Sequence, residues 1–190
     1  MPFDSPDVYA YIREDGTYVL TQPLTYHGRD ETFTVPAAFD TDLASVPSFL
    51  TWLVPIAGVG DRAAILHDWL CVHLDDYWHD LHNPHCSEPA PDGPPPANSR
   101  DTDGIFRRCL RELGVPTVRR WLYWTGVRWG ALANPARRAG WAKDAPLVAA
   151  ISLCALPVVL LASIGVGIGL VVYGAAEAVA GIVAKMRGKK

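Results

Sequence analysis

The chain has 190 residues, enough for one domain with a hydrophobic core and an appendage. Its net charge of −3 is unevenly distributed, because residues 1–103 hold four arginines against seventeen acidic residues, a net −13, while residues 104–140 carry +7 and residues 141–190 carry +3. The acidic front part argues against nucleic acid as a partner, and four irregularly spaced cysteines do not indicate a disulfide framework.

The front of the chain has the pattern of short strands. Apolar and polar residues alternate over residues 8–36, with turn residues at Asp15 and again between His27 and Glu31. This pattern predicts a small antiparallel β-meander. Residues 37–60 follow with the composition of a loop, in which prolines limit any helix.

Three helices are predicted next, and they form the helical core of an α+β fold. Apolar residues recur at helical spacing over residues 61–82, 100–113 and 117–132. Gly114 ends the second of these helices. Residues 83–99, between the first and the second, hold six prolines and little apolar surface, which predicts a surface loop.

An apolar segment dominates the end of the chain. In residues 146–184 the only side chain expected to be charged at neutral pH is that of Glu177, and about 20 apolar residues suffice to cross a bilayer. We predict one transmembrane helix over residues 147–173, or a hairpin that folds back at residues 165–169. Basic residues flank both ends of the segment, so the positive-inside tendency does not choose between the two.

The chain therefore divides into two predicted parts. A soluble α+β domain covers residues 1–140, and a hydrophobic membrane segment with a basic tail covers residues 141–190. Residues 1–8 are acidic and contain proline, which does not match a secretory signal. We expect a membrane-anchored protein whose soluble domain lies on the cytoplasmic side.

The stretch "AAILHDWLCVH" places His67 and Asp68 side by side in the first predicted helix. Neighbouring residues of a helix point about 100° apart, so His67 can face the second helix, which carries Asp103, while Asp68 points toward the preceding loop, which carries Asp42. A carboxylate can orient a histidine, and two further carboxylates suit a hard cation. This set predicts attack of water on an ester, with His67 taking the proton while the cation polarises the carbonyl.

These motifs resemble the phospholipase A2 enzymes. "AAILHDWL" followed by "DTDGIF" is similar to the helix pair of that family, and "TDLASVP" stands where the family has its calcium loop. The resemblance implies that His67 is the catalytic base and that Asp103 orients it. It further implies that the carboxylates of Asp68 and Asp42 and the carbonyl of Leu43 bind calcium.

A second resemblance covers roughly residues 10–130. The segments "FTVPAAFDTDLASVPSFL", "AAILHDWL", "TDGIF" and "YWTGVRWG" resemble a family of small phage and prophage proteins known as domain of unknown function 1353. This resemblance implies no established activity. The sequence departs from the phospholipase pattern at Cys71, where those enzymes have tyrosine, and in "TDLASVP", which contains no glycine.

Two other interpretations of the histidines remain open. Nitrogen and sulfur ligands for zinc are present between residues 71 and 86, but their spacing matches no regular zinc motif, and the alternative is a solvated helix end. A phosphohydrolase of the HD type would need an upstream metal-binding histidine, for which His27 is the candidate. The zinc ligands would come from Cys71, His73, His79, His82, His85 and Cys86.

Tryptophan and arginine gather in residues 107–141. Tryptophan favours the headgroup zone of a membrane, where arginine can bind lipid phosphate. The alternative is that the aromatic stripe packs into the core. The residues predicted to lie at the membrane interface are Trp121, Trp124, Arg128, Trp129 and Trp141.

Two functions of different classes are expected as alternatives. The first is a membrane-tethered, phage-type, phospholipase A2-like hydrolase of lipid esters that uses calcium. The second is a non-catalytic phage membrane or virion protein, such as a tail, lysis or exclusion component in contact with other phage structural proteins. In the second, the histidine and its carboxylate partner would serve the fold alone.

Overall fold

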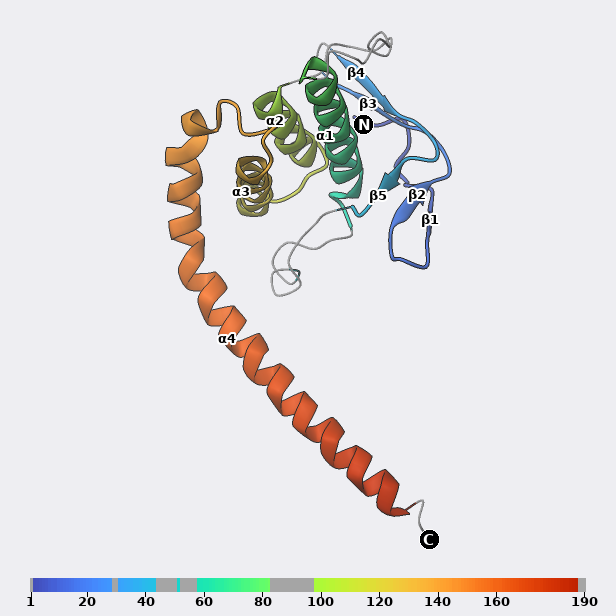
Figure 1. The fold of residues 1–190 in the computed structure, drawn as a ribbon, viewed down its shortest axis with the longest axis vertical. Coiled ribbons are helices and arrows are strands. Elements are labelled where there is room, and N and C mark those ends of the chain that lie inside the picture. Colours follow the sequence, from blue (N-terminus) through green and yellow to red (C-terminus); the bar gives the residue numbers. More distant parts are fainter. Residues whose placement is uncertain (1, 29–30, 44–50, 52–57, 83–97, 188–190) are drawn as a thin grey trace.

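The computed structural model describes residues 2–28, 31–43, 51, 58–82 and 98–187, and of residues 74–82 it describes the backbone alone. It shows an α+β protein in which small antiparallel sheets precede four helices (Figure 1). The strands are β1 (Ala10–Ile12), β2 (Tyr18–Leu20), β3 (Leu24–His27), β4 (Thr32–Val35) and β5 (Asp40–Thr41). The helices are α1 (Asp61–His82), α2 (Ser99–Glu112), α3 (Thr117–Ala133) and α4 (Trp141–Arg187).

The strands form two sheets instead of the predicted single meander. Both expected hairpins are present, β1 with β2 and β3 with β4, but β2 takes β5 as its second neighbour instead of β3. The backbone N–H of Ala38 donates to the carbonyl of Leu20, which brings the chain back to β2 just before β5. Pro23 directly precedes β3 and has no N–H to donate to a ladder, which favours a break between β2 and β3.

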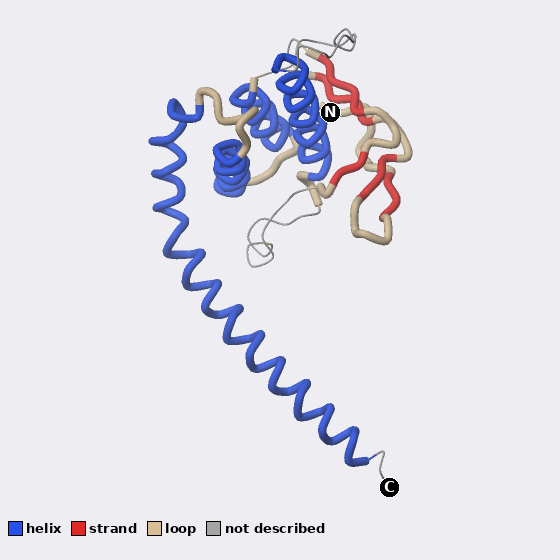
Figure 2. The backbone as a smooth tube through the Cα atoms, in the orientation of Figure 1, coloured by secondary structure: helices blue, strands red, loops and turns tan. Residues whose placement is uncertain are grey.

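The core lies between the β3–β4 sheet and α1. Tyr26 and Val35 are fully buried on the strands, while Ile65 and Leu66 are buried on α1. Figure 2 shows the strands on one side of α1 and the other helices on its opposite side. Helix α1 is therefore covered on both faces, and polar groups on its inner faces need partners within the protein.

Helices α1 and α2 run antiparallel. At one end of the pair, a side chain at Gly60 would meet Leu110, and further along the pair His67 of α1 contacts Asp103 of α2. Helix α2 begins at a capping residue, Asn98, whose side-chain oxygen accepts from the N–H of Asp101. The predicted helix pair is thus present, with its helices antiparallel, and it brings the two predicted site segments together.

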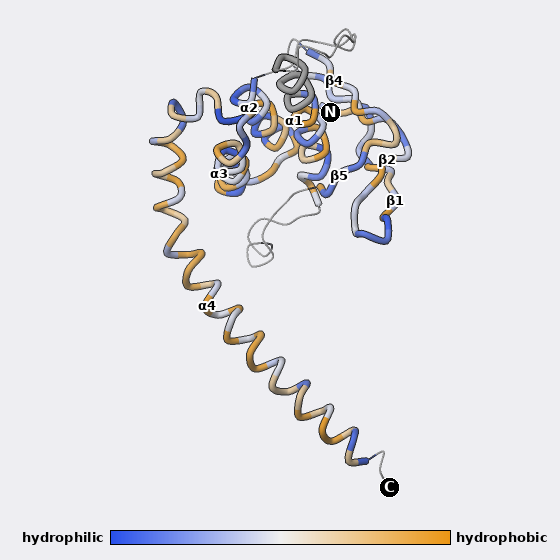
Figure 3. Tube along the Cα trace, in the orientation of Figure 1, coloured by the Kyte–Doolittle hydropathy of each residue, from blue (hydrophilic) through white to orange (hydrophobic). Residues whose placement is uncertain are grey.

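Helix α4 is one continuous helix of 47 residues, so within the described chain there is no hairpin at residues 165–169. At 1.5 Å per residue it is about 70 Å long. Figure 3 shows apolar residues along almost its whole length, and most of its large apolar side chains are exposed. By length and composition this helix can cross a membrane, which weakly suggests a membrane anchor.

The first three turns of α4 belong to the globular part. Val148 is fully buried, Asp144 is nearly so, and the indole N–H of Trp141 donates to the carbonyl of Arg128 at 2.6 Å. The indole N–H of Trp129 donates to Ser152 Oγ at 3.1 Å. The packed domain therefore extends past the predicted boundary at residue 140 and reaches about residue 152.

A first prediction concerns this boundary. A chain ending at Gly140 loses Asp144 and Val148, and it leaves the buried Arg128 without one of its two carboxylate partners. We expect its free energy of unfolding to lie about 3–5 kcal/mol below that of a chain ending at Ser152. Urea unfolding followed by tryptophan fluorescence measures the difference. Equal stability of the two shortened chains would show that the first turns of α4 add nothing to the fold.

Candidate functional site

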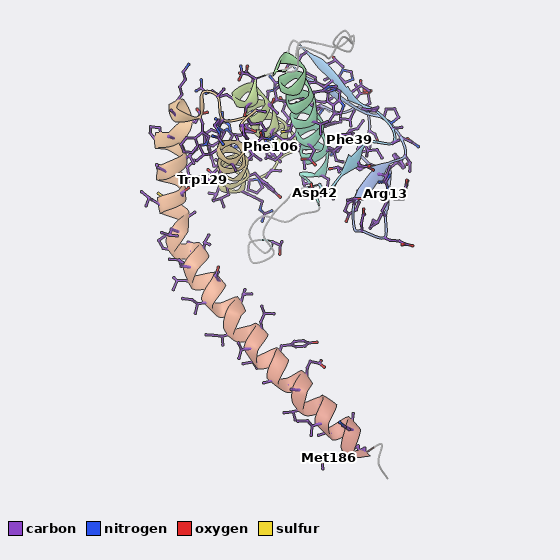
Figure 4. The ribbon with its side chains drawn as sticks, in the orientation of Figure 1. Arg13, Phe39, Asp42, Phe106, Trp129 and Met186 are labelled. Atoms are coloured by element: carbon purple, nitrogen blue, oxygen red, sulfur yellow. The ribbon has the colours of Figure 1, made fainter. Side chains whose placement is uncertain are left out.

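The centre of the candidate site is a histidine and an aspartate buried between α1 and α2. His67 is 6% exposed and Asp103 is fully buried, and His67 Nε2 lies 2.7 Å from Asp103 Oδ1. The ring of Phe106, which is labelled among the helices in Figure 4, lies 4.8 Å from the imidazole between the ring centroids. The contact between the two helices that the sequence suggested is present.

The protonation states follow from the surroundings of the pair. Burial lowers the pKa of His67 below its usual value, although Asp103 partly opposes that shift, so the imidazole is neutral at pH 7. Burial alone would raise the pKa of Asp103, but its hydrogen bond with His67 and the charges of Arg137 and Arg128 outweigh burial and lower it. An ionised Asp103 can only accept, so Nε2 carries the imidazole proton and Nδ1 is left as a free base.

Two arginines hold the other lone pairs of Asp103. Arg128 Nη1 donates to Oδ2 at 2.7 Å, and Arg137 Nη2 donates to Oδ1 at 2.8 Å. Arg128 is fully buried on α3, whereas Arg137 lies on the segment between α3 and α4. The carboxylate of Asp103 is therefore fixed from three directions.

Arg137 carries no sequence signal for this site, and Arg128 occupies a different environment from the one predicted for it. Arg128 was expected at the membrane interface, but it is fully buried and bound to Asp103, so no lipid headgroup can reach it. Its burial is tolerated because Asp103 and Asp144 neutralise its charge. The local sequence around an arginine in an aromatic helix does not predict that the arginine is buried and bound to a carboxylate of another helix.

The four predicted interface tryptophans occupy different environments. Trp124 is 6% exposed and packs into the protein, as in the alternative considered for it. The guanidinium of Arg107 covers the ring of Trp121 at 4.2 Å. Trp129 is 47% exposed, and its ring lies 5.5 Å from that of Trp141. Membrane contact stays a prediction for Trp121, Trp129 and Trp141.

Asp68 lies on the Nδ1 side of His67. Its Oδ1 is 4.0 Å from His67 Nδ1, and its Oδ2 accepts from Thr41 Oγ1 at 2.5 Å. Burial raises the pKa of Asp68 to about 7, and the negative charge of Asp42 adds to the rise. The backbone of Leu43 adopts φ 65°, a left-handed conformation, while its N–H donates to Thr41 Oγ1 at 2.9 Å.

The donor chemistry around Asp68 suits a hard cation. A carboxyl with a raised pKa beside a second carboxylate is an arrangement that a divalent cation would stabilise. Asp42, labelled beside the lower end of α1 in Figure 4, and Asp68 would supply the carboxylate oxygens of such a site. Within the described residues no three His, Cys, Asp or Glu side chains form a metal-binding group. The rest of the predicted calcium loop, residues 44–47, lies outside the described residues.

The two other metal interpretations find no support in the described part of the chain. His27 pairs with Asp4 on the exposed side of β3, with Nε2 and Oδ1 2.6 Å apart, and so does not join His67. His73 packs its ring against Trp69 at 4.4 Å. The side chains of the remaining zinc candidates, His79, His82, His85 and Cys86, lie outside the described residues.

Cys71, one turn after His67, contacts the imidazole. Its Sγ lies 3.8 Å from Nδ1 and 3.6 Å from Nε2, so it covers the ring instead of pointing at one nitrogen.

An open depression on α2 is separate from this site. Its walls include Arg100 and Arg107 of α2 and Asp144 of α4, but neither His67 nor its carboxylate neighbours.

Comparison with known proteins gives a family. A family model described as "Protein of unknown function (DUF1353)" matches residues 18–127. The matched region includes His67, Asp68 and Asp103, and it ends one residue before Arg128. No curated protein and no solved structure matches the chain. The function must therefore be argued from the geometry of the site.

Proposed function

The chain belongs to the DUF1353 family of proteins of unknown function, and we propose that it is a membrane-tethered, phospholipase A2-like hydrolase of lipid esters. The observation that carries the proposal is the 2.7 Å contact between Nε2 of the buried His67 and Oδ1 of the buried Asp103; burial lowers the pKa of His67, and the partners of Asp103 lower the pKa of its carboxyl, which favours a neutral imidazole beside a carboxylate. Such a pair leaves Nδ1 as a base of fixed direction, which is the requirement for activating water.

The chain's own residues account for the proton transfers. His67 Nδ1 takes a proton from water as the water oxygen bonds to the ester carbonyl carbon. Asp103 stabilises the imidazolium that forms, because its carboxylate accepts the Nε2–H. His67 then returns the proton to the alcohol oxygen as the bond between that oxygen and the carbonyl carbon breaks, which releases a fatty acid and an alcohol.

Asp68 and Asp42, with the carbonyl of Leu43, are the residues that would hold calcium. Their oxygen donors fit a hard cation, and a cation beside Asp68 would offset the burial and the charge of Asp42, which raise the pKa of this carboxyl. When bound, calcium would supply electrostatic stabilisation of the negative charge that develops on the ester oxygen.

Helix α4 supports a lipid as the substrate class. It presents an apolar surface of transmembrane length directly after the globular part. A hydrolase held at a bilayer meets its substrate at high local concentration. Trp129 and Trp141, near the start of α4, would lie close to the headgroups in this arrangement.

The direct test is release of fatty acid from phospholipid liposomes by the purified full-length protein. We expect release in calcium and none in excess chelator. Release that is indifferent to calcium would remove the cation from the proposal. The absence of release with calcium present, on zwitterionic as well as anionic liposomes, would refute the hydrolase.

A non-catalytic role is the second candidate, and one observation favours it. Asp103 contacts Arg128 and Arg137 as well as His67, so the same carboxylate ties α1, α2, α3 and the segment before α4 together. In that case the protein would be a phage membrane or virion component whose buried polar network stabilises the fold. It would release no fatty acid under any condition.

The hydrolase proposal predicts a particular pH profile. Because burial lowers the pKa of His67 below 6.5, the base stays neutral in weakly acidic solution. At saturating calcium we expect the acid limb of the rate of hydrolysis to lie below pH 6.5. Initial rates between pH 4.5 and 8 on a fixed liposome composition locate the limb. A limb at or above pH 6.5 would mean that a group other than His67 controls the reaction.

A further inference from the structure

Arg128 connects the candidate site to the start of α4. Its guanidinium donates through Nη1 to Asp103, and its Nε lies 3.3 Å from Asp144 Oδ2. Arg128 and Asp103 are fully buried, and Asp144 is 7% exposed. One charged side chain thus bridges the partner of His67 and the first turn of the apolar helix.

The bridge is incomplete on the Arg128 side. Its Nε is within ion-pair distance of Asp144 but lacks hydrogen-bond geometry, and its Nη2 has no partner among the described residues. Both carboxylate oxygens of Asp144 accept from Arg100 Nε, Oδ1 at 3.0 Å and Oδ2 at 3.2 Å. Asp144 is therefore shared between an exposed arginine and a buried one.

The backbone of Arg128 is also held by α4. The indole N–H of Trp141 donates to its carbonyl at 2.6 Å. The first turn of α4 therefore contacts Arg128 twice, at its main chain through Trp141 and at its guanidinium through Asp144. The family match stops at residue 127, so this connection lies outside the region that matches the family.

The charges explain what the connection does. Asp103 faces the guanidinium groups of Arg128 and Arg137 as well as His67. Asp144 offsets the charge of Arg128. Without Asp144, Asp103 would have to neutralise the charge of the buried Arg128 without a second carboxylate. Asp103 would then accept the Nε2 proton of His67 in a weaker hydrogen bond.

We infer that Asp144 is a positioning residue, and that through Arg128 the first turn of α4 fixes Asp103 against His67, so that the membrane helix and the site move as one unit. The inference rests on the proposed role of the His67–Asp103 pair. Displacement of α4 at its first turn, as on leaving a bilayer, would loosen Asp103 and switch the site off. The connection is thus a device that limits activity to the membrane-anchored state.

The test is nitrogen-15 NMR of the histidine side chains of the full-length protein in detergent micelles, at one pH. The His67 signal is assigned by its loss in His67→Asn. In Asp144→Asn we expect the Nε2 proton of His67 to exchange with water at least tenfold faster than in the parent. Trp141→Phe, which removes only the hydrogen bond to the Arg128 carbonyl, should change it in the same direction and serves if Asp144→Asn does not fold.

Ser152→Ala is the matched control. It removes another hydrogen bond between α3 and α4, the one from Trp129, without touching Arg128, and it should leave the His67 signal unchanged. A parent-like His67 signal in folded Asp144→Asn or Trp141→Phe protein would overturn the inference. In an active parent, Asp144→Asn should also lower kcat by roughly ten- to a hundredfold at unchanged KM. An inactive parent refutes the hydrolase, while the NMR result still decides the connection.

Discussion

Replacing His67 with asparagine is expected to lower the rate of fatty-acid release by about 10²- to 10⁴-fold, because the substitution removes the base that accepts the proton of water. Calcium binding should change little, since Asp68 and Asp42 remain. Initial rates on liposomes and calorimetric titration with calcium measure the two properties separately. Excess calcium should not restore activity to this variant.

His27→Asn is the matched control for that substitution. His27 also contacts an aspartate, Asp4, but on the exposed side of β3 and away from α1 and α2. We expect parent-like hydrolysis and calcium binding from it. An active His67→Asn protein would exclude His67 as the base.

The non-catalytic candidate makes a different prediction for the same variant. If His67 serves the fold alone, its replacement leaves Asp103 with an unsatisfied acceptor position, at a cost of about 1–3 kcal/mol in the free energy of unfolding. The parent would then show no hydrolysis to lose. Urea unfolding of the parent and of His67→Asn, beside the activity assay, separates a catalytic loss from a structural one.

Local sequence predicts the helices, and with them the contact between His67 and Asp103, because both depend on the spacing of apolar and polar residues within one helix. The apolar periodicity of residues 61–82 coincides with α1, and it turns His67 toward α2. Asp103 lies on the facing side of a helix whose end carries a clear signal, Gly114. Two antiparallel helices with these buried faces leave few registers in which both polar groups are paired.

The two arginine partners of Asp103 could not be predicted because their contacts depend on the tertiary fold. In sequence, Arg128 stands in an aromatic stretch and looks like a solvated or lipid-facing side chain. Its burial requires Asp103 and Asp144, which lie 25 and 16 residues away. Arg137 lies outside any regular element and carries no periodic signal.

The same reason explains two differences between the predicted and the described fold. Strand β5 has two residues, too few for an alternating pattern, so its pairing with β2 is set by the path of the chain and not by local composition. The boundary at residue 140 was placed where the apolar segment begins. Packing of Val148 and Asp144 against the domain shows that composition alone does not reveal which turns of a long apolar helix are buried.

Replacing Asp68 with asparagine should have opposite effects on stability with and without calcium. The pKa of Asp68 is about 7 in the folded protein against an ordinary value of 3.8. A carboxyl that holds its proton more tightly when folded lowers the free energy of unfolding as pH rises from about 4 to about 7. In chelator above pH 7, we therefore expect Asp68→Asn to be more stable than the parent by about 2–4 kcal/mol.

Calcium should reverse that order. A cation held by Asp68 and Asp42 stabilises the folded parent in proportion to its binding, whereas Asp68→Asn retains one carboxylate fewer and binds more weakly. Thermal unfolding at pH 8, in chelator and over a series of calcium concentrations, follows both effects on the same protein. Asp7→Asn, an exposed change before β1, is the control and should follow the parent in both conditions. If calcium stabilises Asp68→Asn as much as the parent, Asp68 is no calcium ligand. Its raised pKa would then reflect burial beside Asp42 and nothing more.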